Sequence, residues 1–333
     1  MSLPSGQIQY QLAHIHEDRA SEIVISHAVL LPLAVIAVVA RFIARRLCRA
    51  HIGLDDYMIV VALLAAIGEA TGALLCVANG GAKHAVTVKD PIKLNKLILV
   101  TEAFYIPGVT AVKLSALLLY RRIFPSKNFR RILWIVGGAI ICYTIPQPPI
   151  LIFQCVPISG AWDPAVHIRA KCVPLNDIFT AFGSLNVVTD IITLSLPLPL
   201  IWRLQINKVQ KFQLFGTFLL GYFVCVVSII RVLKIKQLSP TDPGWTDVDP
   251  CVWSLVEVCV AIVCACLPTF RVLFNRLILQ KRVGSSAYLV DMPRYPSSTT
   301  NERQADFRSK DSAAQVEVAN VVPNNWVQVP ACE

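Results

Sequence analysis

Six ionisable side chains lie inside long apolar segments of the sequence, where an unpaired charge is costly. They are Glu69, Glu102, Lys113, Asp190, Arg231 and Glu257. At the centre of a bilayer each would cost about 3 kcal/mol unless it faced the interior of a helix bundle and met a partner. Such residues either pair to fix the packing of helices, or they form a ligand-coupled switch or a proton path. Both interpretations fit this pattern.

Three of these residues fall at one depth. Each helical residue rises by about 1.5 Å, so Glu102, Arg231 and Glu257 all lie about six residues, or roughly 9 Å, inside the outer ends of their segments. This spacing predicts a buried cluster in which one guanidinium group lies between two carboxylates.

Lys113 and Asp190 form a second, deeper layer. Their Cα levels differ by about 6 Å, a gap that a lysine side chain can bridge. Asn186 precedes Asp190 by one turn on the same helix face and is expected to join this pair. The sequence therefore predicts six candidates for a ligand or switch site, namely Glu102, Lys113, Asn186, Asp190, Arg231 and Glu257.

Eleven cysteines are present, and their positions relative to the apolar segments sort them. Cys155 and Cys172 bracket a loop on the outer side of the membrane, where disulfides persist. A bridge between them would close about 17 residues and contribute about 3 kcal/mol. Cys76 and Cys251 stand at the outer ends of two segments, so a second bridge between them is a further hypothesis. The Cys-x-Cys pair of the last segment points in two directions on a helix, and we expect no metal site.

Residue patterns typical of enzymes or of nucleic-acid binding do not occur in the chain. There is no His-x-x-x-His helix, Gly-x-Ser-x-Gly elbow or phosphate-binding Gly-Lys-Ser/Thr loop, and the six histidines are scattered, so we expect no enzyme. The formal net charge is +10. The basic residues nevertheless lie in short runs between apolar segments, rather than on one arm or face, which argues against a nucleic-acid partner.

The apolar segments themselves predict the elements that position the charged residues. The chain is 55% hydrophobic and 16% charged, whereas a soluble domain carries about 25% charged residues. Each segment runs for about 20 residues, enough to cross roughly 30 Å of hydrocarbon as a helix. The predicted fold class is an all-α membrane protein, a bundle of seven transmembrane helices in a lipid bilayer. The predicted spans are residues 23–44, 57–78, 97–120, 132–153, 178–202, 212–235 and 251–274.

Two local patterns add detail to these helices. Gly68 and Gly72, four residues apart and flanked by alanines, give the second helix a small-residue face that predicts close packing within the bundle. Pro197 and Pro199 in the fifth helix predict a kink.

Basic residues in the short connections decide the orientation. Clusters of Lys and Arg follow the first, third, fifth and seventh helices, beginning with Arg41, Arg45, Arg46 and Arg49. In a seven-span chain these clusters share one side, which is therefore cytoplasmic, although four lysines between residues 83 and 96 oppose the trend. We expect the N-terminus outside and the C-terminus in the cytoplasm, in a multi-pass protein most typical of the plasma membrane, with an endomembrane as the alternative.

This topology divides the chain into three parts. Residues 1–22 form a short extracellular tail without the basic start and apolar block of a signal peptide, so the first helix is expected to direct insertion. Residues 23–276 form the seven-helix domain. Residues 277–333 are expected to be a flexible cytoplasmic tail, because they are rich in Ser, Thr, Asn, Asp and Pro.

A series of short motifs resembles one known family. In chain order they are Asp55-Asp56-Tyr57, Lys113-Leu-Ser115, Tyr120-Arg121-Arg122-Ile123-Phe124, Cys155-x-Pro157 with Trp162 and Cys172, Asn186-x-x-x-Asp190, Leu196-Pro197-Leu198-Pro199, Trp202-x-Leu204, Arg231, Trp253-Ser254 with Glu257, and Cys266-Leu267-Pro268. Their order and spacing over about residues 40–276 resemble the fungal rhodopsin-domain integral membrane proteins. That family includes plant-surface-sensing receptor-like proteins and membrane proteins encoded in mycotoxin clusters such as the satratoxin cluster.

The resemblance implies a function but not a pigment. A retinal pigment needs a lysine in its last helix for a Schiff base, and residues 251–274 contain none, so we expect no retinal and no other cofactor. The chain also lacks the Asp-Arg-Tyr and Asn-Pro-x-x-Tyr signatures of animal receptors. The N-terminal cysteine-rich domain of the family's cell-surface members is missing too, so a ligand would enter the bundle itself or its outer loops.

The leading expectation is an orphan receptor-like protein that senses a small molecule or a surface cue. Its gene would stand beside a secondary-metabolite cluster, and a receptor would need a signalling partner in the cytoplasm. A transporter, or an accessory protein for export or self-tolerance, is the second hypothesis. A membrane scaffold without a ligand is the third. Flux across a vesicle membrane would indicate transport, and saturable binding without flux would indicate sensing.

Overall fold

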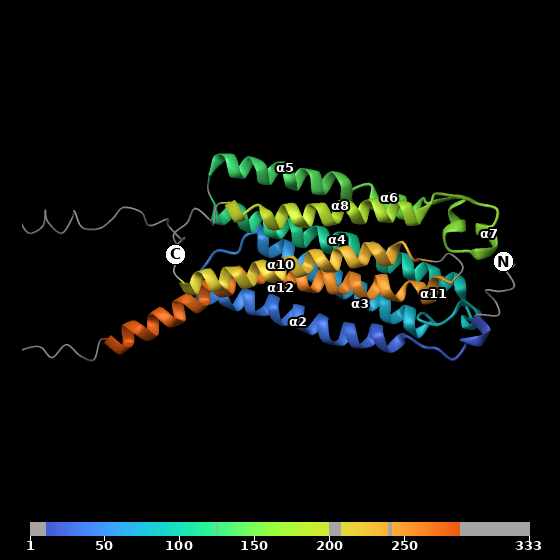
Figure 1. The fold of residues 1–333 in the computed structure, drawn as a ribbon, viewed down its shortest axis with the longest axis horizontal. Helices are drawn as coiled ribbons and strands as arrows, with labels where there is room; N and C mark the ends of the chain where they lie inside the picture. The colour runs from blue at the N-terminus through green and yellow to red at the C-terminus, as the bar shows by residue number, and fades with distance from the viewer. Residues whose placement is uncertain (1–10, 125, 200–207, 239–241, 287–333) are drawn as a thin grey trace, which may run out of the picture. The chain divides into compact units, whose positions relative to one another are not determined.

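The computed structural model describes residues 11–124, 126–199, 208–238 and 242–286. Contacts divide the chain into two units, Met1–Leu273 and Phe274–Glu333, and the first holds the helix bundle. The described residues contain seven helical stretches that are long and apolar enough to cross a membrane. Figure 1 shows these helices running alongside one another. The predicted seven-helix fold is therefore confirmed.

The bundle consists of long helices joined by short elements. The long helices are α2 (Ala20–Leu47), α3 (Leu54–Ala78), α4 (Pro91–Ile123), α5 (Lys127–Thr144), α8 (Leu175–Ser195), α10 (Lys208–Ile235) and α12 (Val248–Ser286). The short elements are η1 (Ala85–Thr87), α6 (Gln147–Ile152), β1 (Cys155–Val156), η2 (Ile158–Ala161), α7 (Pro164–His167), β2 (Lys171–Cys172) and α11 (Pro243–Thr246).

Prolines break two of the helices where the sequence predicted continuous spans. The fourth span is two helices, α5 and α6, because Pro148 and Pro149 lack the N–H groups that would continue α5 and instead occupy the first turn of α6. The fifth span was expected to kink at Pro197 and Pro199; α8 ends at Ser195, a turn follows at residues 196–197, and residues 198–199 are again helical. The part of this predicted span at residues 200–202 lies outside the described residues.

Other helices are longer than predicted. α4 begins at Pro91, where Asp90 accepts a hydrogen bond from the Lys93 backbone N–H at 3.0 Å and so caps the helix. At the other end of the chain, α12 continues to Ser286 and takes in the first ten residues of the predicted tail. Residues 287–333 of that tail lie outside the described residues.

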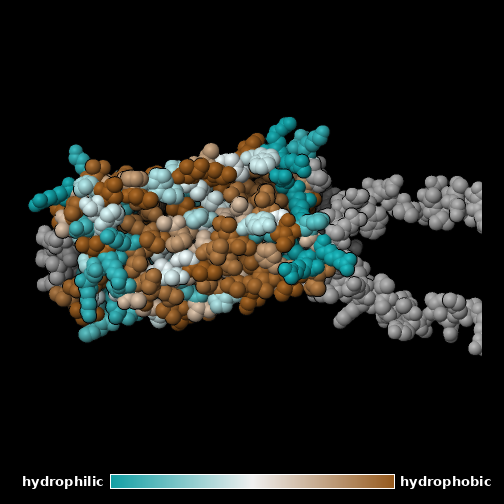
Figure 2. Space-filling view, turned by 180° about the vertical axis from the view of Figure 1, so that it is seen from behind, coloured by the Kyte–Doolittle hydropathy of each residue, from teal (hydrophilic) through white to brown (hydrophobic). Residues whose placement is uncertain are grey.

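Apolar side chains cover the outside of the first unit. Figure 2 shows them concentrated over the middle of this face, with hydrophilic residues at both ends. Ile36, Leu64 and Ile135 each expose more than half of their surface, on three different helices. Water would penalise such exposure, whereas lipid favours it. The chain is therefore a multi-pass membrane protein.

The core of the bundle lies between α2, α3, α4 and α12, whose buried residues include Ala34, Ile59, Val109 and Leu255. The predicted small-residue face packs within this bundle, against α4. A Cβ atom added to Gly68 would come within 2.5 Å of the Phe104 ring. One added to Gly72 would come within 2.5 Å of the Thr101 hydroxyl. Only glycine allows the two helices to approach this closely.

One end of the bundle, called the disulfide end below, carries η1, α7, α11 and a small hairpin. In the hairpin β1 pairs with β2 antiparallel, and Cys155 lies opposite Cys172. The predicted Cys155–Cys172 disulfide is formed. The second bridge is not formed, because Cys76 and Cys251 are both free thiols buried in the bundle.

We expect the double variant Cys155→Ser/Cys172→Ser to unfold more easily than the wild type. The bridge joins residues 17 apart, and a loop of this length restrains the unfolded chain by about 3 kcal/mol. Thermal unfolding in detergent micelles measures the change. Cys142→Ser is the matched control, because Cys142 is an exposed free thiol on α5. Equal unfolding temperatures for the double variant and the control would contradict the prediction.

Candidate functional site

Lys113 on α4 is buried, and its ammonium group contacts four oxygen atoms that belong to three residues of α8. Its ammonium group donates to the Asn186 carbonyl oxygen at 2.8 Å, to Asn186 Oδ1 at 2.7 Å and to Thr189 Oγ1 at 2.8 Å. It also lies 3.0 Å from Asp190 Oδ1. A full set of oxygen partners compensates the loss of hydration of the buried charge. The structure thus brings together the three residues of the predicted deeper layer.

Glu257 on α12 belongs to the same network. The Asn186 side-chain amide donates to Glu257 Oε1 at 2.6 Å, and the Tyr105 hydroxyl donates to Glu257 Oε2 at 3.1 Å. On α10, Ser228 donates to Asp190 Oδ2 at 3.0 Å. Four helices, α4, α8, α10 and α12, are therefore joined through polar side chains at one place.

Arg231 on α10 takes a different place from the one its depth suggested. Its guanidinium group lies 3.5 Å from Glu102 Oε2 and donates through Nε to Ser254 at 2.7 Å. It also stacks over the Tyr105 ring at 3.8 Å. Arg231 was expected between two carboxylates, but Glu257 turns instead toward Asn186 and Tyr105. Depth fixes the level of a side chain, whereas the rotation of each helix decides which neighbours it meets.

Tyr105 therefore connects the two predicted layers into one polar network. It touches Arg231 through its ring and Glu257 through its hydroxyl. The sequence prediction missed both Tyr105 and Ser254 as members. A signal was present, since Tyr105 follows Glu102 by three residues on the same helix face.

A further buried acid, the last of the six ionisable residues predicted within the apolar segments, stands apart from these contacts. Glu69 on α3 exposes 1% of its surface, and neither carboxyl oxygen has a hydrogen-bond partner among the described residues. Glu102, Arg231 and Glu257 are close enough to act on it electrostatically. The region thus holds more carboxyl groups than bases.

A cavity of about 790 Å³ opens beside this network and reaches the disulfide end. Its walls are mostly apolar and include Ile98, Val109 and Phe179. Its polar lining includes Glu102, Tyr105, Asn186, Arg231, Asp247 and Gln154. This size is typical of sites that hold a small organic molecule. Four of the polar network's members therefore reach a space in which a ligand fits.

The mouth of the cavity lies among the short elements of the disulfide end, including η1, α7 and α11. His84, next to η1, lies 2.6 Å from Asp242 Oδ2 through its Nδ1 and stacks on Trp245 of α11 at 4.2 Å. Arg19 donates to Asp249 at 2.7 Å and so ties the start of α2 to α12. The Glu22 carboxylate, with Asp249, raises the pKa of Arg19 above its ordinary value. The sequence prediction missed these contacts.

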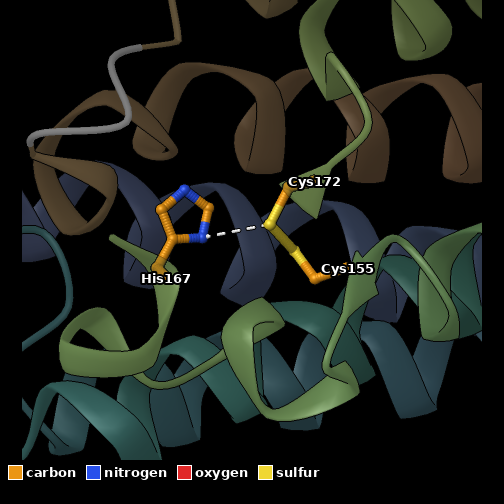
Figure 3. Close-up of side chains that lie close together, drawn as sticks. All are labelled: Cys155, His167 and Cys172. Atoms are coloured by element: carbon orange, nitrogen blue, oxygen red, sulfur yellow. Dashed lines mark hydrogen bonds between the residues drawn. A yellow bond between two sulfur atoms is a disulfide. The ribbon is translucent and has the colours of Figure 1, made fainter. Parts of the chain in front are cut away.

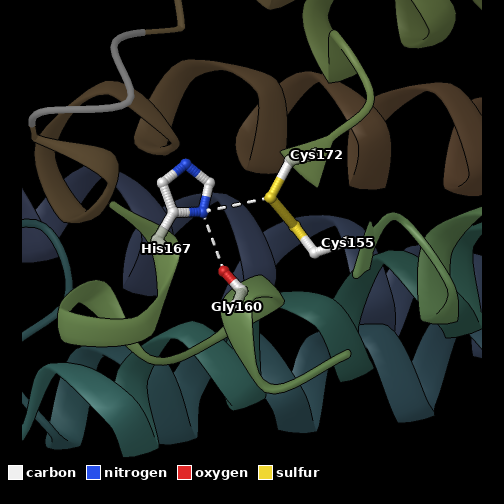
Figure 4. Close-up of a disulfide and its surroundings, with 4 residues drawn as sticks. All are labelled: Cys155, Gly160, His167 and Cys172. Carbon is white, nitrogen blue, oxygen red and sulfur yellow. Dashed lines mark hydrogen bonds between the residues drawn. A yellow bond between two sulfur atoms is a disulfide. The ribbon is translucent and has the colours of Figure 1, made fainter. Parts of the chain in front are cut away.

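The mouth also contains the disulfide and one histidine. Figure 3 shows His167 pointing at the bridge between Cys155 and Cys172. His167 Nδ1 donates to the Gly160 carbonyl oxygen at 2.8 Å and lies 3.5 Å from Cys172 Sγ, as Figure 4 shows. The grouping has the residue types of a metal site. However, sulfurs bonded to each other are not thiolate ligands, and a protonated Nδ1 cannot coordinate, so the group is a structural disulfide.

A second buried ionic cluster lies at the opposite end of the bundle. Arg41 Nη2 lies 2.6 Å from Asp55 Oδ2, and Arg41 Nε lies 2.8 Å from Asp56 Oδ1. Arg45 pairs with both carboxylates, and Arg41 Nη1 donates to the Ala265 carbonyl oxygen on α12 at 2.7 Å. Both arginines were assigned to a loop, but α2 extends to Leu47 and buries them.

Comparisons with known proteins agree with this architecture. The fungal rhodopsin domain matches residues 40–276. Polyenoic acids biosynthesis gene cluster protein Ba17b of Metarhizium anisopliae is 27% identical over 266 residues, 75% of this chain and 72% of that protein. Satratoxin biosynthesis SC1 cluster protein 4 of Stachybotrys chartarum is 31% identical over 169 residues, which are 50% of this chain and 61% of that protein.

A more distant relative has a different name. Receptor GIN3 of Arthrobotrys oligospora is 25% identical over 191 residues, which are 55% of this chain and 45% of that protein. The domain match covers most of the chain and all seven apolar helices contribute to it. This chain belongs to the family of fungal rhodopsin-domain membrane proteins.

Proposed function

We propose that this chain is a receptor that senses a small molecule bound in the bundle cavity. The observation that carries the proposal is the position of Asn186. It lines the cavity, and its side chain lies between the buried Lys113 on α4 and Glu257 on α12. A ligand that reaches Asn186 therefore contacts the hydrogen bonds that hold three helices together.

The way in which such a ligand would act follows from this contact. A ligand shifts a protein between two states only when it binds them with different affinities. Here a ligand that hydrogen-bonds to Asn186 or Arg231 competes with bonds between helices, so it favours an arrangement in which those bonds are remade. The polar network then transmits occupancy of the cavity to α4, α8, α10 and α12.

The relatives support the kind of ligand and the setting. One relative is named a receptor, and two are named as proteins of biosynthesis clusters. We infer that the ligand is a secondary metabolite and that the gene belongs beside a cluster of this kind. The disulfide end, with its oxidised cysteines, faces the outside of the plasma membrane. The opposite end, with its basic residues, would meet a cytoplasmic signalling partner.

We expect Ile98→Trp to abolish the binding of a metabolite by the purified protein. Ile98 lines the cavity, and the larger indole group would occupy part of its volume. The protein in lipid nanodiscs is incubated with a metabolite extract of the source fungus, and retained compounds are identified by mass spectrometry. Compounds held by the wild type and lost by Ile98→Trp occupy the cavity.

Ile92→Trp is the matched control, because Ile92 lies on the same helix but is exposed and outside the cavity lining. Retention of the same compound by both variants would contradict binding in the cavity. A bound compound is then added to sealed proteoliposomes. Saturable binding without uptake supports sensing. Accumulation inside the vesicles would show a transporter instead, and the absence of any retained compound would favour a scaffold.

A further inference from the structure

The lining of the cavity has more acidic than basic side chains, since Glu102, Asp163 and Asp247 line it with Arg231 as the one arginine or lysine in the described part of the chain. Glu102 and Asp247 both line it, and they lie close enough for their charges to interact. The described residues give Asp247 no ion pair, and Glu102 has a single one, to Arg231 at 3.5 Å. Of these two carboxyl groups, only that of Glu102 has a cationic partner among the described residues.

That guanidinium group is already engaged on several sides. Arg231 donates to Ser254 at 2.7 Å, faces Glu102 and covers the Tyr105 ring at 3.8 Å. Glu257 and Glu69 add further acidic groups behind it. An anionic ligand would therefore compete with Glu102 for Arg231 and would meet an excess of acids. A cationic ligand would reduce that excess.

A second observation points the same way. Gln154 exposes 2% of its surface and lines the same cavity. Its Oε1 atom has no hydrogen-bond partner among the described residues. A buried acceptor without a partner costs free energy, and a donor group of a ligand would satisfy it.

We propose that the ligand of this cavity is a predominantly apolar molecule that carries a protonated amine. The ammonium group would lie between Glu102 and Asp247, and the apolar body would lie against Ile98, Val109 and Phe179. This inference rests on the proposed receptor function, since it names the ligand class of the same cavity. A cavity of this kind would bind amines more tightly than acids or alcohols of equal length, whereas its apolar walls alone would not distinguish the three classes.

Three probes with one apolar body test the ligand class: octylamine, octanoic acid and octanol. Each is titrated calorimetrically into the full chain in nanodiscs, and the heat measured with empty nanodiscs is subtracted. We expect octylamine to bind about tenfold more tightly than octanol, because a charge-assisted hydrogen bond to a carboxylate is strong. Octanoic acid is expected to bind more weakly than octanol.

Two isosteric variants then locate the ammonium group. Glu102→Gln and Asp247→Asn are each expected to lower the affinity for octylamine about tenfold relative to the affinity of the same variant for octanol. Saturable octanol binding by the variant also shows that it is folded. Asp177→Asn is the matched control, because Asp177 is an exposed acid of α8 outside the cavity lining. Its affinity for octylamine should equal that of the wild type.

The remaining outcomes overturn the inference in distinguishable ways. Equal affinities for octylamine and octanol would exclude the amine and leave a cavity that binds apolar molecules, as the proposed function requires. Tighter binding of octanoic acid would show that Arg231 selects an acid. If none of the three probes binds above empty nanodiscs, the cavity does not accept such molecules. The retention of metabolites by wild type and Ile98→Trp then decides the proposed function separately.

Discussion

Arg41→Met is expected to lower the free energy of unfolding by about 3–5 kcal/mol, because it leaves buried carboxylates without their main partner. Arg41 exposes 0% of its side chain and pairs with Asp55 and Asp56, which expose 4% and 0%. Methionine has a similar length but no charge, so the two acids would keep Arg45, and Asp55 would keep Arg122 at 3.8 Å. The substitution would also remove the hydrogen bond to the Ala265 carbonyl oxygen on α12.

The change is measured as the shift in the midpoint of unfolding when SDS is added to the protein in mild-detergent micelles. Arg46→Met is the matched control, because Arg46 lies on the same helix and is exposed. Arg41→Lys is expected to fall between them, since an ammonium group keeps the charge but lacks the planar set of five donors with which Arg41 reaches Asp55, Asp56 and Ala265 in different directions. A midpoint for Arg41→Met equal to that of Arg46→Met would show that the cluster does not stabilise the fold.

Lys113→Met is expected to cost a similar amount, about 3–5 kcal/mol, at the centre of the bundle. Asp190 would lose its ion pair, and Asn186 and Thr189 would lose a donor. The double variant Lys113→Met/Asp190→Leu removes both charges, so it should recover part of the loss. The coupling energy between the two substitutions is obtained from the four unfolding midpoints of the double-mutant cycle.

Additive effects of the two substitutions would contradict a direct partnership between Lys113 and Asp190. A swap of the two charges is a weaker test of the pair. Lys113 also donates to the backbone carbonyl group of Asn186, which a relocated lysine would not reach in the same geometry. We therefore expect the swapped pair to remain less stable than the wild type, even though both charges are present.

The apolar segments and the deeper charged layer could be predicted from the sequence for simple physical reasons. A span of hydrocarbon demands a helix of fixed length, so the seven helices follow from the lengths of the apolar segments. The rise per residue then fixes the level of each charge, and Lys113 and Asp190 met as their levels suggested. Asn186 joined them because one helical turn keeps it on the same face.

The rotation of the helices could not be predicted in the same way. Glu257 was predicted at the level of Arg231, yet it accepts hydrogen bonds from Asn186 and Tyr105. The contact between His84 and Asp242 could not be predicted either, because the two residues are 158 positions apart in the sequence. Nothing in either local pattern indicates the other.

Arg41 and Arg45 show a second kind of limit. A count of the basic residues between apolar segments treats each of them as an exposed loop charge. Arg46 is exposed, but Arg41 and Arg45 are buried. α2 runs beyond its apolar part, and the acidic start of α3 lies beside it, so each arginine meets a carboxylate rather than water. The adjacent acids Asp55 and Asp56 were the available signal, since two carboxylates at a helix start opposite an arginine-rich helix end predict pairing.

The two hydrogen bonds of the Asn186 side chain limit which amino acids can replace it. Its oxygen receives the Lys113 ammonium group, and its nitrogen donates to Glu257. The two ends of one amide group are thus held by opposite charges, and turning the amide over would set like against like on both sides. Aspartate would repel Glu257, leucine would serve neither neighbour, and glutamine would be one methylene group too long. Asparagine therefore fits this position better than these three residues of similar size or chemistry, because its one amide group serves both neighbours.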